Sequence, residues 1–147
     1  MKFAVFSEIP VDRDRVFEAL CDPAILRRSI PGCESMTPTG PHAPDTYDVA
    51  LRIGIAGLKG SYNGRAAIRE KQPPDSLTLG FEGKGAPGFV RGSAVIVLSD
   101  LNGGTRVACE ADVQVGGVIA AVGSRLIEAA AKKLAGDFFR QVSSELR

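Results

Sequence analysis

The residues of this chain that could do chemistry are few and widely spaced. The three cysteines, Cys21, Cys33 and Cys109, form no CxxC pair, and the one histidine, His42, lies in a proline-rich stretch typical of a surface loop. Isolated thiols of this kind are typical of the reduced, mostly buried cysteines of a cytoplasmic protein. The sequence contains no nucleophile elbow, no diagnostic carboxylate pair and no metal-ligand cluster, so no metal site is predicted.

Acid–base catalysis would require an ionisable side chain inside the fold. Strand alternation makes Glu82, Arg91 and Glu110 the candidates, and each could equally face solvent. Two basic pairs, 27–28 and 132–133, indicate either a solvated surface or a docking site for an acidic partner or lipid headgroups. The sequence therefore gives no positive sign of catalysis, and we predict no catalytic residue.

The composition indicates one ordinary folded domain over residues 1–147. The 18 basic and 17 acidic residues leave a net charge of +1, which argues against a general nucleic-acid binder. Hydrophobic residues make up 44% and charged residues 24%, close to the average of globular proteins. The N-terminus lacks a signal-peptide pattern, and the apolar run over 115–123 is far shorter than the ~20 residues of a membrane span. We therefore expect a soluble, cytoplasmic protein.

The hydrophobic periodicity predicts the elements that must position any site. A strand over 2–9 is followed by two short helices, over 12–20 and 24–29, the second introduced by Asp22 and Pro23. Alternation then predicts a run of strands, over 33–37, 47–56, 62–69, 77–81, 89–99 and 105–115. Turns are expected over 83–88 and 102–104. From Ile119 to Leu146 the apolar period becomes helical.

This order predicts an α+β fold in which the long C-terminal helix lies across the concave face of a curved antiparallel sheet of six to seven strands. The middle strands are crowded with glycines, at positions 60, 64, 80, 83, 85, 88 and 92. Such glycines indicate either room for a ligand beneath the helix or severe bending of the sheet. The difference matters because a cavity would predict ligand binding, whereas a solid core would predict an assembly protein.

Several local motifs point to a known family. They are Cys21-Asp22-Pro23, Ile30-Pro31-Gly32-Cys33-Glu34, Gly60-Ser61-Tyr62-Asn63-Gly64 with Glu70, Gly103-Gly104-Thr105-Arg106-Val107, and the glycine-rich stretch from Val115 to Gly123. With the element order, they make the chain resemble the SRPBCC (START-like, Bet v 1-like, helix-grip) superfamily. Within it the chain is similar to the CoxG family of carbon monoxide dehydrogenase subunits, over essentially its whole length.

The resemblance implies a non-catalytic accessory protein of a molybdenum hydroxylase of the CO dehydrogenase kind. It also implies an apolar cavity for a lipid-like ligand such as a quinone, with no tightly bound cofactor, and a place at the inner face of the membrane. Some members carry an additional C-terminal segment suited to membrane attachment. This chain ends at Arg147, so we expect peripheral contact without an anchor. The alternatives are a polyketide cyclase- or dehydratase-like enzyme and an assembly protein with a solid core. The oligomeric state, a dimer included, stays open.

A ligand between sheet and helix would touch mid-sheet aromatic residues, the turn after the second helix and the apolar stripe of the long helix. The predicted ligand-binding residues are Ile30, Tyr62, Phe81, Phe89, Ile119, Val122, Leu126 and Ala130. Pro31 and Gly32 are expected to shape one rim of the cavity mouth. Gly116, Gly117 and Gly123 flank the start of the long helix, where they allow close packing, a small-residue gate or a phosphate site.

Overall fold

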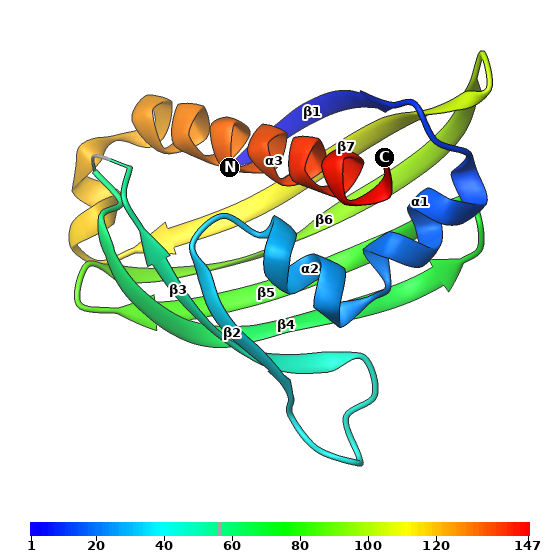
Figure 1. Cartoon of the computed structure of the whole chain (residues 1–147). Coiled ribbons are helices and arrows are strands. Elements are labelled where there is room, and N and C mark those ends of the chain that lie inside the picture. Colours follow the sequence, from blue (N-terminus) through cyan, green and yellow to red (C-terminus); the bar gives the residue numbers. More distant parts are fainter. Residues whose placement is uncertain (56) are drawn as a thin grey trace.

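Among the described residues, 1–55 and 57–147, the computed structural model of the chain contains seven strands in one antiparallel sheet. Their order is β1-β7-β6-β5-β4-β3-β2, so β2 to β7 form a meander and β1 returns beside β7 (Figure 1). The strands are β1 (Lys2–Ile9), β2 (Cys33–Pro38), β3 (Thr46–Ile53), β4 (Gly60–Gln72), β5 (Ser76–Gly85), β6 (Gly88–Leu101) and β7 (Gly104–Gly116). The predicted α+β fold is confirmed.

The two short helices between β1 and β2 begin where the sequence predicts. Helix α1 (Arg13–Leu20) is capped by Asp12, whose carboxylate accepts a hydrogen bond from the Arg15 amide at 3.3 Å. Helix α2 (Pro23–Ser29) is capped by Asp22, which accepts from the Ala24 amide at 2.9 Å. Each aspartate satisfies an amide that has no partner within its own helix.

Helix α3 (Ser124–Leu146) lies across the concave face of the sheet, as predicted (Figure 1). It begins later than expected, because residues Val118–Val122 form a separate 3₁₀ helix, η1. Gly123 separates the two with a φ of +96°, a backbone conformation that glycine tolerates and a continuous helix cannot contain. Helix α3 contacts β1, α1, α2 and η1, so it closes one side of the curved sheet.

The strand ends differ from the prediction in two places. The sequence predicts that β3 reaches residue 56, but the strand ends at Ile53, and Ala56 lies outside the described residues. The turn expected over 83–88 is shorter, because β5 continues to Gly85 and β6 starts at Gly88. Glycines do not interrupt a strand where their missing side chains let the neighbouring strand come close.

Close approach of neighbouring strands explains several of the mid-sheet glycines. A Cβ at Gly64 would overlap the backbone carbonyl of Glu82, and one at Gly85 would overlap that of Ser61. A Cβ at Gly92 would overlap the Asp112 carbonyl in the same way. These three positions therefore serve the bending of the sheet. Gly83 differs, because its nearest neighbours would lie 3.9 Å away.

Candidate ligand-binding site

Burial along the concave face changes from one end of the sheet to the other. Towards α1, the inward-facing side chains are fully buried: Tyr47, Ile68, Leu77, Ile96 and Val107. Towards η1, the inward-facing apolar side chains of the same strands are only half-buried: Val49, Leu51, Ile53, Ala66, Leu79, Phe81, Val90 and Val115. The core is therefore more complete towards α1, and towards η1 buried side chains such as Tyr62, Val113 and Ile119 alternate with half-buried ones.

The side chains of α3 follow the same division. Its C-terminal half packs with Phe138, Phe139 and Val142, and the two phenylalanine rings meet edge to face with centroids 5.0 Å apart. Its first half buries Ile127 and the short side chain of Ala130, and Ala131 and Leu134 are half-buried. The side chains of this region are therefore less completely buried than those around the C-terminal half of α3. We name this region, between the first half of α3 and the β3–β6 end of the sheet, the candidate site.

Five of the predicted ligand-binding residues lie around the candidate site. Tyr62 and Phe81 come from the inward faces of β4 and β5, Ile119 and Val122 from η1, and Ala130 from α3. The Tyr62 hydroxyl donates a hydrogen bond of 2.6 Å to the Leu58 carbonyl, which ties the connection between β3 and β4 to the sheet.

Two predicted ligand-binding residues point elsewhere and are corrected. Phe89 is 40% exposed on the outer face of β6, where its ring covers Gly116 and the Arg91 guanidinium lies 5.9 Å from its centroid. The inward position belongs to Val90, because successive residues of a strand face opposite sides. Leu126 is 63% exposed on α3, and its neighbour Ile127 is buried in its place.

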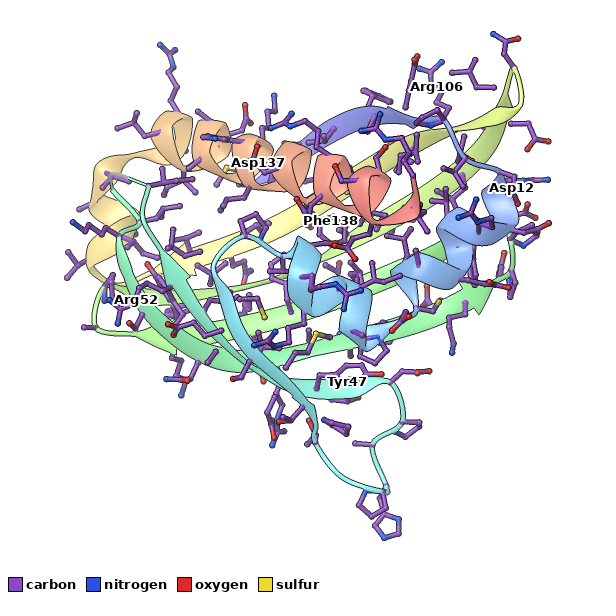
Figure 2. All side chains as sticks on the ribbon, viewed as in Figure 1. Asp12, Tyr47, Arg52, Arg106, Asp137 and Phe138 are labelled. Carbon is purple, nitrogen blue, oxygen red and sulfur yellow. The ribbon has the colours of Figure 1, made fainter. Side chains whose placement is uncertain are left out.

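Ile30 lies at a second hollow, which is separate in its lining from the candidate site. The turn from Ile30 to Cys33 forms one wall of this hollow of about 420 Å³, and Asp137 and Gln141 of α3 form the opposite one. Figure 2 shows Asp137 on α3. Pro31 lies in the wall, and Gly32, with a φ of +76°, admits the Arg52 carbonyl where a Cβ would collide with it. The Arg52 amide donates a hydrogen bond of 2.8 Å to the Gly32 carbonyl, so this turn also fastens α2 to β3.

The three glycines around η1 are not equivalent. Gly117, with a φ of +83°, lies against the Gly88 backbone, and the Ile119 amide donates a hydrogen bond of 2.8 Å to the Pro87 carbonyl. Gly116 lies under the Phe89 ring. Gly123 has open space where its side chain would be. Close packing therefore accounts for the first two glycines, and the helix break accounts for the third.

The candidate site is lined by apolar side chains. Glu82, Arg91 and Glu110, the three candidates for acid–base work, belong to the outward-facing set of their strands. Among the described residues, no inward-facing Asp, Glu, Lys, Arg or His of β3 to β7 lies beside the candidate site. Asp100 of β6 belongs to the inward-facing set, but it lies at the opposite end of the sheet, 3.4 Å from the Arg13 side chain of α1. The neutral polar groups of the inward face include the Tyr62 hydroxyl and the Cys109 thiol. Burial raises the pKa of the Tyr62 hydroxyl, and it raises the pKa of the Cys109 thiol to about 11, so both groups are neutral at physiological pH.

A third hollow lies on the outer face of the sheet, and it is polar. It has a volume of about 520 Å³, and small residues of neighbouring strands, Ala67, Gly80 and Ser93, stand in one cross-strand row of its lining. The next row alternates in charge, with Arg65 opposite Glu82 and Glu82 opposite Arg91. Sequence reasoning missed this hollow. Its signal is a row of small side chains beside a row of charged ones, and that row can be found only once the strand register is known.

Two further properties concern the whole of the described chain. Within residues 1–55 and 57–147, no helix has the length and apolar character needed to cross a bilayer. The same residues bring no three His, Cys, Asp or Glu side chains together in an arrangement that could hold a metal ion.

Comparison with known proteins gives a family and several similar structures. The family model described as the CoxG subunit of carbon monoxide dehydrogenase matches residues 7–147. The crystal structure of a conserved protein from Geobacillus kaustophilus has a TM-score of 0.93 at 34% sequence identity, covering 99% of this chain and 94% of that one. No curated protein matches this chain significantly.

More distant similarities concern the fold alone. Protein CV1439 from Chromobacterium violaceum has a TM-score of 0.70 at 14% identity, with 97% of this chain and 94% of that chain covered. The crystal structure of Ara h 8.0201 also has a TM-score of 0.70, at 16% identity, with 99% and 96% covered. Together they place the chain among proteins with the same curved sheet and long C-terminal helix.

Proposed function

We propose, from the fact that this chain belongs to the CoxG family of carbon monoxide dehydrogenase subunits, that it is an accessory protein which holds an apolar ligand in the candidate site. The observation that carries the proposal is the change in burial along the concave face. A solid core would bury Leu51, Leu79 and Phe81 as completely as it buries Leu77 and Ile96, and these three side chains are only half-buried. An apolar guest would complete their burial.

The chemistry of the walls favours a quinone or another lipid-like molecule. The half-buried side chains are aliphatic or aromatic, and no charged side chain faces them from the described strands. Burial of apolar surface is favourable by about 25 cal/mol for each Å² removed from water. A ligand with a ring and an isoprenoid tail would therefore bind through the apolar area that it buries. The Tyr62 hydroxyl already donates its hydrogen bond to the Leu58 carbonyl. The shape of the site would therefore determine which ligand binds.

The proposed role is one of holding and delivering a ligand, without a catalytic step. An enzyme of the same fold acting on a hydrophobic substrate would need an acidic or basic side chain at its bound substrate. The titratable groups of the inward-facing strand residues include Tyr47, Tyr62 and Cys109, and burial raises the pKa of each. Such groups hold their protons at neutral pH and are poorly suited to act as bases.

The family name supports the choice of partner. We propose that the protein serves a molybdenum hydroxylase of the CO dehydrogenase kind, and that it works at the inner face of the membrane, where an apolar electron carrier would be found. The protein itself would supply shape and exclusion of water, and the oxidation chemistry would belong to the enzyme served.

Two neighbouring alanines of β4 allow a matched test. Ala66 faces the candidate site beside Phe81, and Ala67 faces the polar hollow on the outer side. Calorimetric titration with ubiquinone-1, a quinone with a short tail, is expected to show binding by the natural protein and by Ala67→Phe. Ala66→Phe fills the proposed space and is expected to weaken binding at least tenfold while remaining folded. Absence of binding by the natural protein, or equal binding by both variants, would contradict the proposal.

A further inference from the structure

A patch of apolar side chains lies on the outer face of the sheet, the face turned away from α3. Phe6 of β1 lies opposite Ala108 of β7, which lies opposite Val97 of β6, so the three form one row across the strands. Ala4 and Val95 lie in the next row. Phe6 is 63% exposed, Val97 46% and Val95 44%. The solvated face of an antiparallel sheet normally carries polar side chains, so these five residues, which we call the outer patch, indicate a surface that is covered in use.

Two opposite charges border the outer patch at equal distances from its centre. Arg106 and Glu110 stand two positions before and two positions after Ala108 on β7, so all three face the same side of the sheet. Both charged side chains are exposed. Their backbones lie about 13 Å apart along the strand, and strand side chains stand roughly perpendicular to the sheet. The two charges are therefore too far apart to pair within one chain.

Neither charge has an ion-pair partner among residues 1–55 and 57–147. Glu8 lies opposite Arg106 in the sheet, but the Arg106 guanidinium lies over the Phe6 ring instead, 5.6 Å from its centroid. Figure 2 shows Arg106 on the outside of the molecule. The cross-strand neighbours of Glu110 are an alanine and a valine. Both charges are therefore available to groups outside the chain.

We propose that the outer patch joins two copies of this chain into a symmetric dimer in which the two sheets pack face to face. The row of Phe6, Ala108 and Val97 in one copy packs against the same row of the other. Arg106 of each copy forms an ion pair with Glu110 of the other, so the interface contains this pair twice. Burial of the apolar row supplies the attraction, and the two ion pairs fix the orientation of the copies.

The positions of the two charges select this arrangement. The copies of a symmetric dimer use the same surface and are related by a two-fold axis. An axis that runs across the strands over Ala108 reverses the direction of β7, so Arg106 meets Glu110 on both sides of the axis. An axis that runs along β7 would place Arg106 against Arg106 and Glu110 against Glu110, and such like-charge contacts are unfavourable. Packed sheets lie about 10 Å apart with nearly aligned strands, and the first axis satisfies this geometry.

A second copy of the chain matches the outer patch better than an unrelated protein does. The patch has an apolar centre, and its border charges have opposite signs and equal spacing from Ala108. A surface with this pattern is complementary to itself after a two-fold rotation. An unrelated partner would need the same apolar row and the same two charges in reversed order.

The dimer leaves the candidate site free in both copies. The candidate site lies on the concave face beneath α3, and the outer patch lies on the opposite face of the same sheet. Each copy would therefore turn its candidate site away from the interface. The proposal goes beyond the proposed function and does not depend on it.

Sedimentation velocity of the full chain over a series of concentrations tests the proposal. The natural protein is expected to form a reversible dimer with a dissociation constant in the micromolar range, as small interfaces often do. Arg106→Glu and Glu110→Arg are each expected to raise the dissociation constant at least tenfold, because each replaces two attractive pairs by two repulsive ones. Phe6→Ser with Val97→Ser is expected to weaken the dimer to a similar extent by removing its apolar centre.

Mixing the two charge-reversal variants separates lost pairing from damage to the fold. The Arg106→Glu chain carries two acidic residues at the border, and the Glu110→Arg chain carries two basic ones. One copy of each should restore both ion pairs, so the equimolar mixture is expected to dimerise within about threefold of the natural dissociation constant. The chain with both substitutions should also recover, because it exchanges the charges and keeps their order opposite. Arg125→Glu, at an exposed position of α3 outside the outer patch, is the control and is expected to dimerise normally.

Each contrary outcome is distinct. A natural protein that stays monomeric over the whole concentration series would overturn the proposal. A dimer that survives both charge reversals, or one that mixing does not restore, would show that the copies meet elsewhere, and it would overturn the proposed arrangement too. Binding of ubiquinone-1 is measured on the same preparations. Binding by a monomeric protein would leave the candidate site standing while the dimer fails, and a dimer without binding would do the reverse.

Discussion

Two glycines that face each other across β4 and β5 have opposite surroundings. A side chain at Gly64 would collide with the Glu82 carbonyl, whereas at Gly83 its nearest neighbours would be 3.9 Å away. The first glycine lets the two strands approach closely, and a side chain at the second would make ordinary van der Waals contacts. A glycine in these strands therefore has to be judged one position at a time.

Gly64→Ala and Gly83→Ala should therefore differ in stability. The first has to push two strands apart, and we expect it to lower the free energy of unfolding by about 1–3 kcal/mol, the usual cost of overpacking. The second lowers the conformational entropy of the unfolded chain and causes no clash in the folded one. It should therefore change the free energy of unfolding by less than about 1 kcal/mol. Urea denaturation measures both. Equal destabilisation by the two variants would show that both glycines serve close packing.

Cys109 predicts a dependence of stability on alkaline pH. Burial, followed by the nearby charge of Glu110, raises the pKa of its thiol to about 11, whereas an unfolded cysteine ionises near ~8.5. Between these values the unfolded chain has lost the thiol proton and the folded chain has kept it, so stability falls as pH rises. The contribution of the protonated Cys109 thiol to the free energy of unfolding is complete below about pH 8.5. It decreases by up to about 1.4 kcal/mol per pH unit above that value.

Cys109→Ala provides the comparison for this pH dependence. The variant loses some stability at all pH values because it leaves a small cavity, so the slope with pH is compared and not the level. Urea midpoints between pH 8 and pH 11 should fall more steeply for the natural protein than for the variant. Parallel curves would mean that the thiol is accessible to water in the folded state.

At the scale of elements, α3 consists of two halves with different surroundings. Phe138, Phe139 and Val142 fasten its C-terminal half to α1, α2 and β1, and the first half faces the candidate site with Ile127 and Ala130. An element with fewer buried side chains opens more easily. We therefore regard the first half of α3, with η1, as the movable cover of the candidate site and the second half as its fixed base.

Hydrogen exchange should resolve these two halves. Amides of residues 139–146 are expected to exchange at least tenfold more slowly than those of residues 127–131, because their opening requires removal of the phenylalanines from the core. Addition of ubiquinone-1 is expected to slow exchange in the first half and to leave the second half unchanged. Uniform protection along α3, unaffected by ubiquinone-1, would argue against a ligand beneath it.

The elements were largely predictable because their signals are local. Alternation along β7 and the capping pairs Asp12–Arg13 and Asp22–Pro23 specify their elements within a few residues of chain. The break at Gly123 was predicted only in part: the glycine was expected to flank the start of the long helix, but the helical period was expected to begin at Ile119. Helix phase was uncertain in the same run, because Leu126 and Ile127 are adjacent apolar residues and either could face the sheet.

The candidate site was less predictable, because it depends on distant contacts. An error of one residue in strand phase reverses the face, and this placed Phe89 in the site instead of Val90. The change from buried to half-buried side chains cannot be recognised in the sequence of any one strand. It arises when the first half of α3, rich in alanine, lies over a strongly bent sheet, and only the packed fold shows it.

At the scale of the whole molecule, the two ends differ in structure. The end with α1 and α2 has the complete core, and salt bridges such as Arg13–Asp75 at 2.6 Å and Arg28–Glu145 at 2.8 Å join its elements. The end with η1 has half-buried walls and exposed apolar side chains, Val118 and Leu126. A molecule with one closed end and one open end suits a protein that takes up and releases an apolar ligand.

The central claim is that an apolar molecule occupies the candidate site. The most direct measurement is purification without denaturation, extraction with organic solvent and mass spectrometry of the extract, alongside Ala66→Phe and Ala67→Phe. We predict a quinone or other lipid-like molecule in stoichiometric amount from the natural protein and from Ala67→Phe, and its loss from Ala66→Phe. Empty extracts from all three, with no binding of added ubiquinone-1, would contradict the claim and favour an assembly protein.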